Sequence, residues 1–466
     1  MTTEMASAPA QKGKDILGHP RGLAYLVFAE SWERFSYYGM QALLVLYMTQ
    51  FLLLPGHVEN IAGFAAFRAM IESAYGQLSP AALASVIFGL YAGGVYLTPL
   101  AGGFIADRWL GRTTTVTLGA LLMALGHFLM AFQVSFLAAL ACLLIGVGLF
   151  KGNIASQVGE LYEQGDPRRA DAFQIYLLGI NIAVIISPLV CGTLGQKYAW
   201  HWGFGAAGVG MVIGLLVYLS GRRYLPVEAP RGKAATAAEK PKFNKRDWTT
   251  VALLIALVPV LATAVVGNQE IFNAYLVWGD ANYQLQFFGQ EMPVTWLLSL
   301  DAFISTGCIA GVIVFWRFYS RFAKEPDEII KLVIGVGVSA LAPLILAAAS
   351  AYQQASGHKV SLEWGVAFHL VNDIGFAMVF PVGLALYSRA APKGTAGLMI
   401  GVYYLHLFFS NMLVGWLGGL LEKMQAPQFW TLHAIIGAAA GGVLFVFAIF
   451  FRKNLAPVEE GEGVKS

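Results

Sequence analysis

Glu30-Ser31-Trp32-Glu33-Arg34-Phe35-Ser36-Tyr37-Tyr38 lies inside an apolar run that covers 23–53. A run of roughly 20 apolar residues is enough to cross a lipid bilayer. Each charged side chain at mid-bilayer costs on the order of 2.5–3.5 kcal/mol, so these charges should not face lipid. The spacing i, i+3, i+4, i+7 and i+8 puts Glu30, Glu33, Arg34, Tyr37 and Tyr38 on one helix face. We expect this face to line a water-filled cavity, and an ion-pair cluster that only holds helices together is the alternative.

The composition is that of a protein with many membrane spans. Hydrophobic residues make up 57% of the 466 positions and charged residues 12%, about half of the charged share of a soluble protein. Glycine, with 52 residues, is typical of membrane helices that approach one another closely. We predict an all-α membrane protein with twelve transmembrane helices, at about 23–53, 81–106, 114–133, 136–159, 172–196, 202–220, 248–279, 293–316, 328–352, 362–387, 395–421 and 428–451.

A polar segment at 221–247 separates the first six predicted spans from the last six. It is rich in Lys and Arg, and we interpret it as a cytoplasmic linker, with a lipid-binding patch as the alternative. The predicted domains are an N-terminal six-helix bundle at 1–220, the basic linker at 221–247, and a C-terminal six-helix bundle with a cytoplasmic tail at 248–466. Lys and Arg concentrate in the loops on the side of the linker, which places both termini in the cytoplasm.

Lys151 lies inside the fourth predicted span, between Gly148 and Gly152. An ammonium group at this depth needs a counter-charge, and Glu30 and Glu33 are the nearest candidates by chemistry. A carboxylate that releases its proton to meet a cation, and takes one back when the cation turns to a substrate, is what proton coupling requires.

We expect no metal and no cofactor. The three cysteines, Cys142, Cys191 and Cys308, fall in predicted spans without metal-ligand spacing and are interpreted as packing residues. His127, His369 and His406 are interpreted in the same way, as buried imidazoles whose polar atoms are satisfied.

Several segments follow the order of a known family. Glu30 to Tyr38 is similar to an E-x-x-E-R-F-x-Y-Y signature, and Phe173, Tyr176 and Asn181 fit an F-x-x-Y-x-x-x-x-N motif of a fifth helix. Phe150-Lys151-Gly152-Asn153 fits a fourth-helix segment, and Pro381-Val382-Gly383 a C-terminal one. These segments resemble the proton-dependent oligopeptide transporter (POT/PTR) family of the major facilitator superfamily. The resemblance covers the whole chain and implies the major facilitator fold and a transporter rather than an enzyme.

The resemblance also implies roles for matching positions. Glu30, Glu33, Arg34 and Lys151 would carry proton coupling, and Arg34 and Lys151 would also receive the peptide carboxylate. The implied gating residues, in the loop after the second span, are Asp107, Arg108 and Arg112. The implied peptide-binding residues also include Tyr37, Tyr38, Tyr91, Asn181, Gln269 and Trp278. For Trp278, an anchor at the membrane interface is the alternative.

The chain departs from the family at the tenth helix. A glutamate is expected five residues before Pro381, where this chain has Phe376. Asp301 stands where the family has an eighth-helix asparagine. Our hypothesis is that either Asp301 or Asp373 supplies the lost negative charge, because a free ammonium in a dry pocket needs a counter-ion. Alternatively, Asp373 only bonds polar neighbours and Asp301 lies near the external surface. The segment 221–247 also leaves no room for the extra helix pair of many bacterial relatives.

The resemblance therefore implies a proton-coupled symporter that imports di- and tripeptides across the bacterial inner membrane. The expected partners are small peptides, protons and the lipid bilayer, with no nucleic acid and a monomeric state. A carrier of the same family for a modified peptide, nitrate or another organic anion is the alternative, because Phe376 replaces the glutamate. A peptide sensor is disfavoured because no signalling domain is attached. An intramembrane hydrolase is disfavoured because no Ser/His or His-Glu-x-x-His arrangement occurs.

Overall fold

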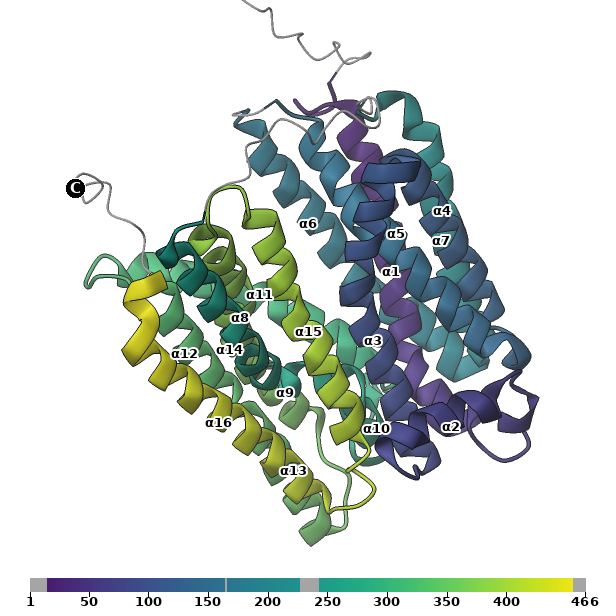
Figure 1. Ribbon diagram of the computed structural model, residues 1–466. Helices are drawn as coiled ribbons and strands as arrows, with labels where there is room; N and C mark the ends of the chain where they lie inside the picture. The colour runs from purple at the N-terminus through teal and green to yellow at the C-terminus, as the bar shows by residue number, and fades with distance from the viewer. Residues whose placement is uncertain (1–14, 164–165, 227–242, 456–466) are drawn as a thin grey trace, which may run out of the picture.

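A computed structural model describes residues 15–163, 166–226 and 243–455 (Figure 1). Most of the predicted linker, with Arg231, Lys233, Lys240 and Lys242, lies outside the described residues, as do the first residues of the chain with Lys12 and Lys14. The described part is almost wholly α-helical. A small antiparallel hairpin of β1 (Gln286–Phe287) and β2 (Gln290–Glu291) interrupts the helices.

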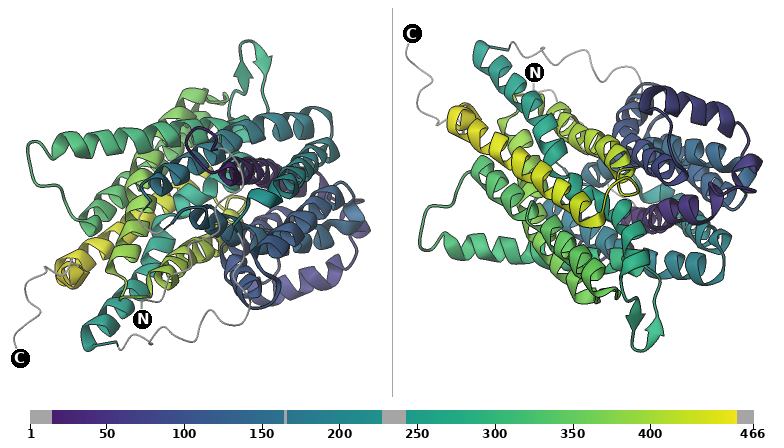
Figure 2. Two further views of the ribbon diagram at one scale, coloured as in Figure 1. Left: turned by 90° about the horizontal axis from the view of Figure 1, so that it is seen from above. Right: turned by 90° about the horizontal axis from the view of Figure 1, so that it is seen from below.

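The helices before the linker pack as one group, which Figures 1 and 2 show as the purple to blue half of the molecule. In this half, α1 packs against α6 and α7, and α5 packs against α3 and α4. The helices are α1 (Arg21–Tyr47), α2 (Phe64–Tyr75), α3 (Pro80–Ile105), α4 (Arg112–Leu129), α5 (Phe136–Glu160), α6 (Arg168–Ser187) and α7 (Trp200–Gly221).

The helices after the linker form the green to yellow half (Figure 1). Here α14 packs against α11 and α12, and α16 against α12 and α13. The helices are α8 (Lys245–Ala264), α9 (Val266–Gln269), α10 (Ala274–Asn282), α11 (Trp296–Tyr319), α12 (Glu328–Ser339), α13 (Ala342–Ser356), α14 (Leu362–Ala390), α15 (Ala396–Gly418) and α16 (Ala426–Phe451).

Two predicted spans are broken helices. The run 248–279 divides into α8, α9 and α10, with Asn273 in a non-helical conformation before α10. The run 328–352 divides into α12 and α13, and Pro343 stands in the first turn of α13. Proline lacks a backbone N–H and fits only the first turn of a helix, which is why α13 starts afresh here.

Ten helical segments of the described residues are long and apolar enough to cross a membrane. The protein is therefore a multi-pass membrane protein. Neither α1 nor α4 is among the ten. The first carries Glu30, Glu33 and Arg34, and the second begins with Arg112 and three threonines. Both nevertheless pack against α7, a candidate span.

The two halves touch mainly along α3 with α15 and along α6 with α11. At Gly89 of α3 a methyl group would meet the carbonyl oxygen of Asn411 at 2.4 Å and the Cα of Gly415 at 2.7 Å. The absence of side chains at these glycines therefore allows α3 and α15 to approach closely.

Polar contacts also join the halves at the end of the molecule that holds α2, which we call the α2 end; the opposite end, where α7 ends and α8 begins, is called the linker end (Figure 1). For example, Gln50 donates a hydrogen bond to Asp280 at 2.9 Å, and the Trp296 indole donates to Thr193 at 2.9 Å. Further contacts here are Ser79 with Glu422, Gln196 with Thr295, and Lys197 with Glu291. At the linker end, by contrast, Arg112 pairs with Glu160 and Arg389 with Glu328, each within one half.

Candidate functional site

The charged face of α1 is buried and internally paired. Arg34 Nε lies 2.8 Å from Glu30 Oε1 and 2.7 Å from Glu33 Oε2, and none of the three side chains is more than 5% exposed. The first contact joins residues one helical turn apart, as the sequence spacing predicts. Among the described residues, Glu30 Oε2, Glu33 Oε1 and Arg34 Nη2 have no hydrogen-bond partner. Buried polar atoms are usually satisfied, so these atoms are candidates to bind water or a ligand.

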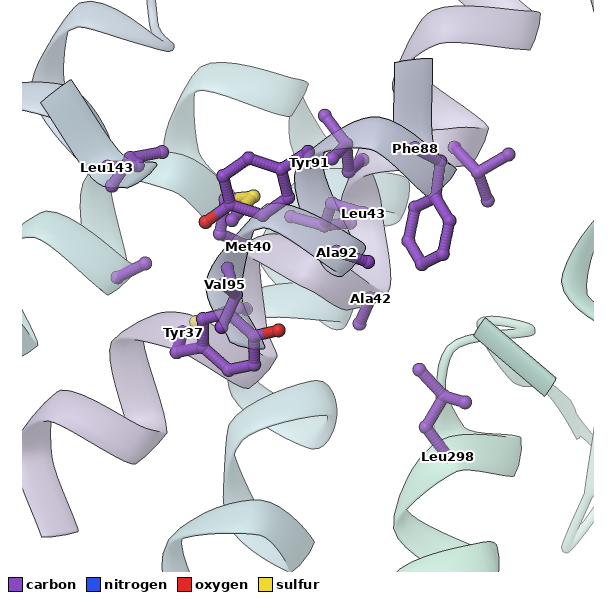
Figure 3. Close-up of a cluster of buried hydrophobic side chains, with 14 of the residues drawn as sticks. Tyr37, Met40, Ala42, Leu43, Phe88, Tyr91, Ala92, Val95, Leu143 and Leu298 are labelled. Atoms are coloured by element: carbon purple, nitrogen blue, oxygen red, sulfur yellow. The ribbon is translucent and has the colours of Figure 1, made fainter. Parts of the chain in front are cut away.

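Three tyrosines surround this face. The Arg34 guanidinium lies 5.8 Å from the ring centre of Tyr37, and Tyr37 contacts Tyr38 edge to face. Tyr38 reaches the other half, where its ring centre lies 6.3 Å from that of Phe272. Tyr37 and Tyr91 pack in the apolar cluster around Met40 and Val95 (Figure 3). The Tyr91 hydroxyl has no partner among the described residues.

Lys151 of α5 stands near the charged face. Its ammonium lies 4.7 Å from the centre of the Tyr96 ring on α3, within reach of a cation–π interaction. It is also close enough to Glu33, Glu30 and Arg34 to interact with their charges. In the described part of the chain, Lys151 forms no ion pair with a carboxylate. Its charge is therefore available to an anion.

The fifth predicted span brings two further polar residues. Tyr176 of α6 is buried and lies beside Glu30, and Asn181 on the same helix is half-buried. Tyr176 and Tyr96 were not assigned to the site from the sequence, although Tyr176 belongs to the motif that ends at Asn181.

In the C-terminal half, Gln269 accepts a hydrogen bond from Asn411 and donates one to Asn268. Trp278 is 3% exposed and packs edge to face on Tyr283 and Trp430. Because its ring is enclosed by other aromatic rings, an anchor at the membrane interface does not describe it.

Glu270 was missed in the sequence, although it is an acidic residue in the predicted seventh span. It is fully buried at the start of a short turn before Asn273. Glu270 Oε2 lies 3.7 Å from His433 Nε2, and its Oε1 accepts hydrogen bonds from Asn273 and Ala274. Its charge inside an apolar run was the signal in the sequence that could have identified it.

Asp301, His369 and Asp373 form a third polar cluster, between α11 and α14. His369 Nδ1 lies 2.8 Å from Asp301 Oδ1. One ring nitrogen of His369 and one carboxylate oxygen from each aspartate all lie within 4.8 Å of one another. His369 is thus a buried imidazole with both nitrogens in hydrogen bonds, as interpreted from the sequence. For His127 and His406 the interpretation was wrong, because both nitrogens of His127 and Nε2 of His406 have no hydrogen-bond partner among the described residues. Asp373 also accepts a hydrogen bond from Asn372, as one alternative proposed.

The missing acidic residue of the tenth helix leaves an apolar position. Phe376 stacks on Phe380 with 5.5 Å between ring centres. Asp301 is 14% exposed, and it is close enough to Tyr38 of α1 to interact with it electrostatically.

The predicted gating residues lie at the linker end, around the turn between α3 and α4. Arg112 contacts Asp107 at 3.4 Å and pairs with Glu160, and Arg108 lies over the Phe104 ring at 5.7 Å. Glu160 is a partner that the sequence analysis did not name.

Buried charges that face one another inside the spans of a multi-pass helical protein are typical of membrane transporters. Residues 113–242 match the PTR2 family model, described as the POT family. In this segment the chain is similar to the POT family. The resemblance predicted from the sequence is confirmed.

Similar proteins cover almost the whole chain. The peptide transporter YePEPT of Yersinia enterocolitica is 28% identical, over 91% of this chain and 92% of its own. A di-/tripeptide transporter of Lactococcus lactis subsp. cremoris is 28% identical, over 93% and 96%. A crystal structure of a peptide transporter POT in complex with sulfate superposes with a TM-score of 0.79 at 24% identity, over 95% of this chain and 97% of that one.

Proposed function

We propose that this protein is a proton-coupled symporter that imports di- and tripeptides by alternating access. The observation that carries the proposal is the Arg34 guanidinium held between two buried carboxylates, with the unpaired Lys151 ammonium beside them. A proton on Glu30 or Glu33 would free Arg34 to bind a peptide carboxylate. Lys151, which has no carboxylate of its own, would bind the same group.

The proposed architecture has twelve spans, six on each side of a linker that is too short for another helix pair. The two halves are the proposed domains, 1–220 and 248–466, and they rock about a site near the middle of the membrane. Both termini lie in the cytoplasm of a bacterium, and the membrane is the inner one. The protein acts as a monomer on peptides and protons, without nucleic acid.

With this topology the α2 end faces outward, and the contacts between the halves close that end. Asp107, Arg108 and Arg112 at the linker end act as the cytoplasmic gate. Their present partners lie within the N-terminal half.

The peptide amine is proposed to bind Asp301 or Asp373, which stand in the half opposite Arg34. Tyr37, Tyr38, Tyr91, Asn181, Gln269 and Trp278 complete the proposed binding site. Their aromatic faces and amide groups suit a peptide backbone rather than one side chain. Asp301→Asn and Asp373→Asn would both transport dialanine normally if neither residue met the amine.

Uptake of labelled dialanine into proteoliposomes under an imposed proton gradient tests the proposal. We expect uptake that depends on the gradient, and loss of that dependence in Glu33→Gln. Lys151→Ala should lose uptake because the carboxylate anchor is gone. Uptake that is equal with and without a gradient would reject proton coupling.

One observation favours a second substrate class. Phe376 and Phe380 make an apolar surface where a carboxylate is expected, so a substrate without a free amine, such as a modified peptide or another organic anion, would fit there. If dialanine is not transported while an amine-blocked dipeptide is, this alternative holds.

A further inference from the structure

The cluster of Asp301, His369 and Asp373 carries two carboxylates and one imidazole in a buried setting. Among the described residues, no Lys or Arg forms an ion pair with either carboxylate. Within the described ranges, the titratable groups close enough to interact with the two carboxylates are Tyr275 of α10, Cys308 of α11 and Tyr38 of α1. None of these groups supplies a positive charge.

Two carboxylates this close cannot both be ionised in a low-dielectric setting unless a cation joins them. Asp373 is 1% exposed. Asn372 donates to its Oδ1 at 3.1 Å, whereas Oδ2 has no partner among the described residues. A proton shared by the cluster would remove the repulsion, and on Oδ2 it would give this atom a hydrogen bond to donate.

A chain of hydrogen bonds leads from the cluster to the α2 end. His369 Nε2 lies 2.9 Å from the Tyr275 hydroxyl, which lies 3.5 Å from the Tyr283 hydroxyl. Tyr283 follows the last turn of α10, and its side chain is fully buried beside the exposed residues Ala281 and Gln284. Hydroxyls and neutral imidazole both donate and accept, so each member can pass a proton along.

We propose that Asp301, His369 and Asp373 form a second proton-binding site, loaded from the outer surface through Tyr283 and Tyr275. Tyr275 gives its hydroxyl proton to His369 Nε2 and regains one from Tyr283, which is buried in this state and regains its own proton from water when the α2 end opens. His369 Nδ1 then releases its proton to Asp301, from which it exchanges with Asp373. Only O–H and N–H bonds are exchanged, and no electrons move between centres.

The inference rests on the proposed function, because a proton bound here becomes useful when substrate replaces it. An ammonium group that reaches Asp301 neutralises the same carboxylate and lets the proton leave. This site lies in the C-terminal half, apart from Glu30, Glu33 and Arg34 on α1.

The bound proton is detected without any transport. Infrared difference spectra of the purified protein in lipid, recorded across a pH titration, should contain a protonated carboxyl band that is missing from Asp373→Asn. Asp280→Asn removes an aspartate near the α2 end that pairs with Gln50 instead, and it should keep that band. A band unchanged in both Asp373→Asn and Asp301→Asn would overturn the proposal.

The path is tested by Tyr275→Phe, with the exposed Tyr352→Phe on α13 as matched control. Tyr275→Phe should slow gradient-driven dialanine uptake roughly tenfold or more, as for loss of a positioned proton donor. Counterflow, which moves no net protons, should stay at the wild-type rate and shows that the variant is folded. His369→Gln should behave as Tyr275→Phe does.

The outcomes separate this inference from the proposed function. If the wild-type protein takes up no peptide under a gradient, the proposed function fails while the infrared band still reports the bound proton. If wild-type uptake is gradient-driven and Tyr275→Phe equals Tyr352→Phe, the path is wrong.

Discussion

Arg34 holds two buried carboxylates and is expected to contribute to the stability of the fold. Its guanidinium neutralises two carboxylates that are at most 3% exposed, and breaking a buried pair by removing one partner typically costs about 3–5 kcal/mol. We expect Arg34→Gln to lower the free energy of unfolding by about that amount, as measured by denaturant unfolding in detergent micelles.

The matched control for Arg34→Gln is the double variant Glu33→Gln/Arg34→Gln, which removes one carboxylate together with its partner. It should be more stable than the single variant, because less uncompensated charge remains buried. Equal stability of Arg34→Gln and the wild-type protein would mean that the pairing contributes nothing to folding.

Glu72 of α2, outside the predicted spans, provides a pH-dependent prediction. Hydrogen bonds from the Leu78 backbone amide and the Arg68 guanidinium lower the pKa of Glu72. A carboxyl group with a lowered pKa stabilises the fold above its unfolded pKa, and this contribution is lost as pH falls through the folded pKa. Hydrogen exchange in the 64–75 segment should therefore accelerate in acid, after correction for the intrinsic rate.

In Glu72→Gln the corrected exchange rate of this helix should be nearly independent of pH over the same acidic range, because the titrating group is gone. Glu59→Gln, in the preceding loop, is the control and should keep the wild-type pH dependence. Unchanged pH dependence in Glu72→Gln would assign the effect to another group.

Local spacing explains which site residues the sequence could reveal. Glu30, Glu33 and Arg34 lie within two turns of one helix, so the helical period alone predicts that they meet. Asp301 and His369 meet only because α11 packs on α14. A contact between two helices so far apart along the chain cannot be predicted from helical spacing. Glu270 is a different case. Its charge inside an apolar run is visible in the sequence, but only the structure shows that His433 lies beside it.

At the scale of the element, glycine decides how closely two helices approach. Gly89 of α3 has no room for a methyl group, since it would lie 2.4 Å from the Asn411 carbonyl oxygen. We expect Gly89→Ala to push α15 away and to lower the free energy of unfolding by about 1–3 kcal/mol, the usual cost of overpacking. Dialanine uptake should fall with it.

Gly103→Ala on the same helix is the control for Gly89→Ala, because a methyl group there meets nothing within 4 Å. It should unfold and transport much as the wild-type protein does. If the two alanine variants were equally stable, the α3–α15 contact would not depend on Gly89.

The breaks within the predicted spans could not be predicted from the sequence. Hydropathy predicted 248–279 as one run because most of its residues are apolar, whereas the chain leaves the helical conformation at Asn273. The Asn273 side chain donates to Glu270 and to the Val414 carbonyl of α15. These tertiary hydrogen bonds support a conformation that local propensity does not predict.

At the scale of the whole molecule, the charge and hydropathy patterns predicted a helical membrane protein, and this is confirmed. They did not predict at which end of the molecule the two halves contact each other. That depends on contacts between residues far apart in sequence, such as Gln50 with Asp280 and Thr193 with Trp296. Those contacts define one of the states between which a transporter must move.

Gly192 offers a test of this state. A methyl group there would lie 2.0 Å from Thr295 Oγ1 of the other half, so Gly192→Val should hold the α2 end apart. An overpacking cost of about 1–3 kcal/mol, confined to the closed state, changes the ratio of the two states roughly 5–150-fold. We expect spin labels placed across the α2 end to report longer distances, and uptake to slow. Gly205→Val on α7, where a methyl group meets nothing within 4 Å, should change neither. Unchanged label distances in Gly192→Val would show that this contact does not govern closure, because a bulky side chain would then fit between two halves that remain together.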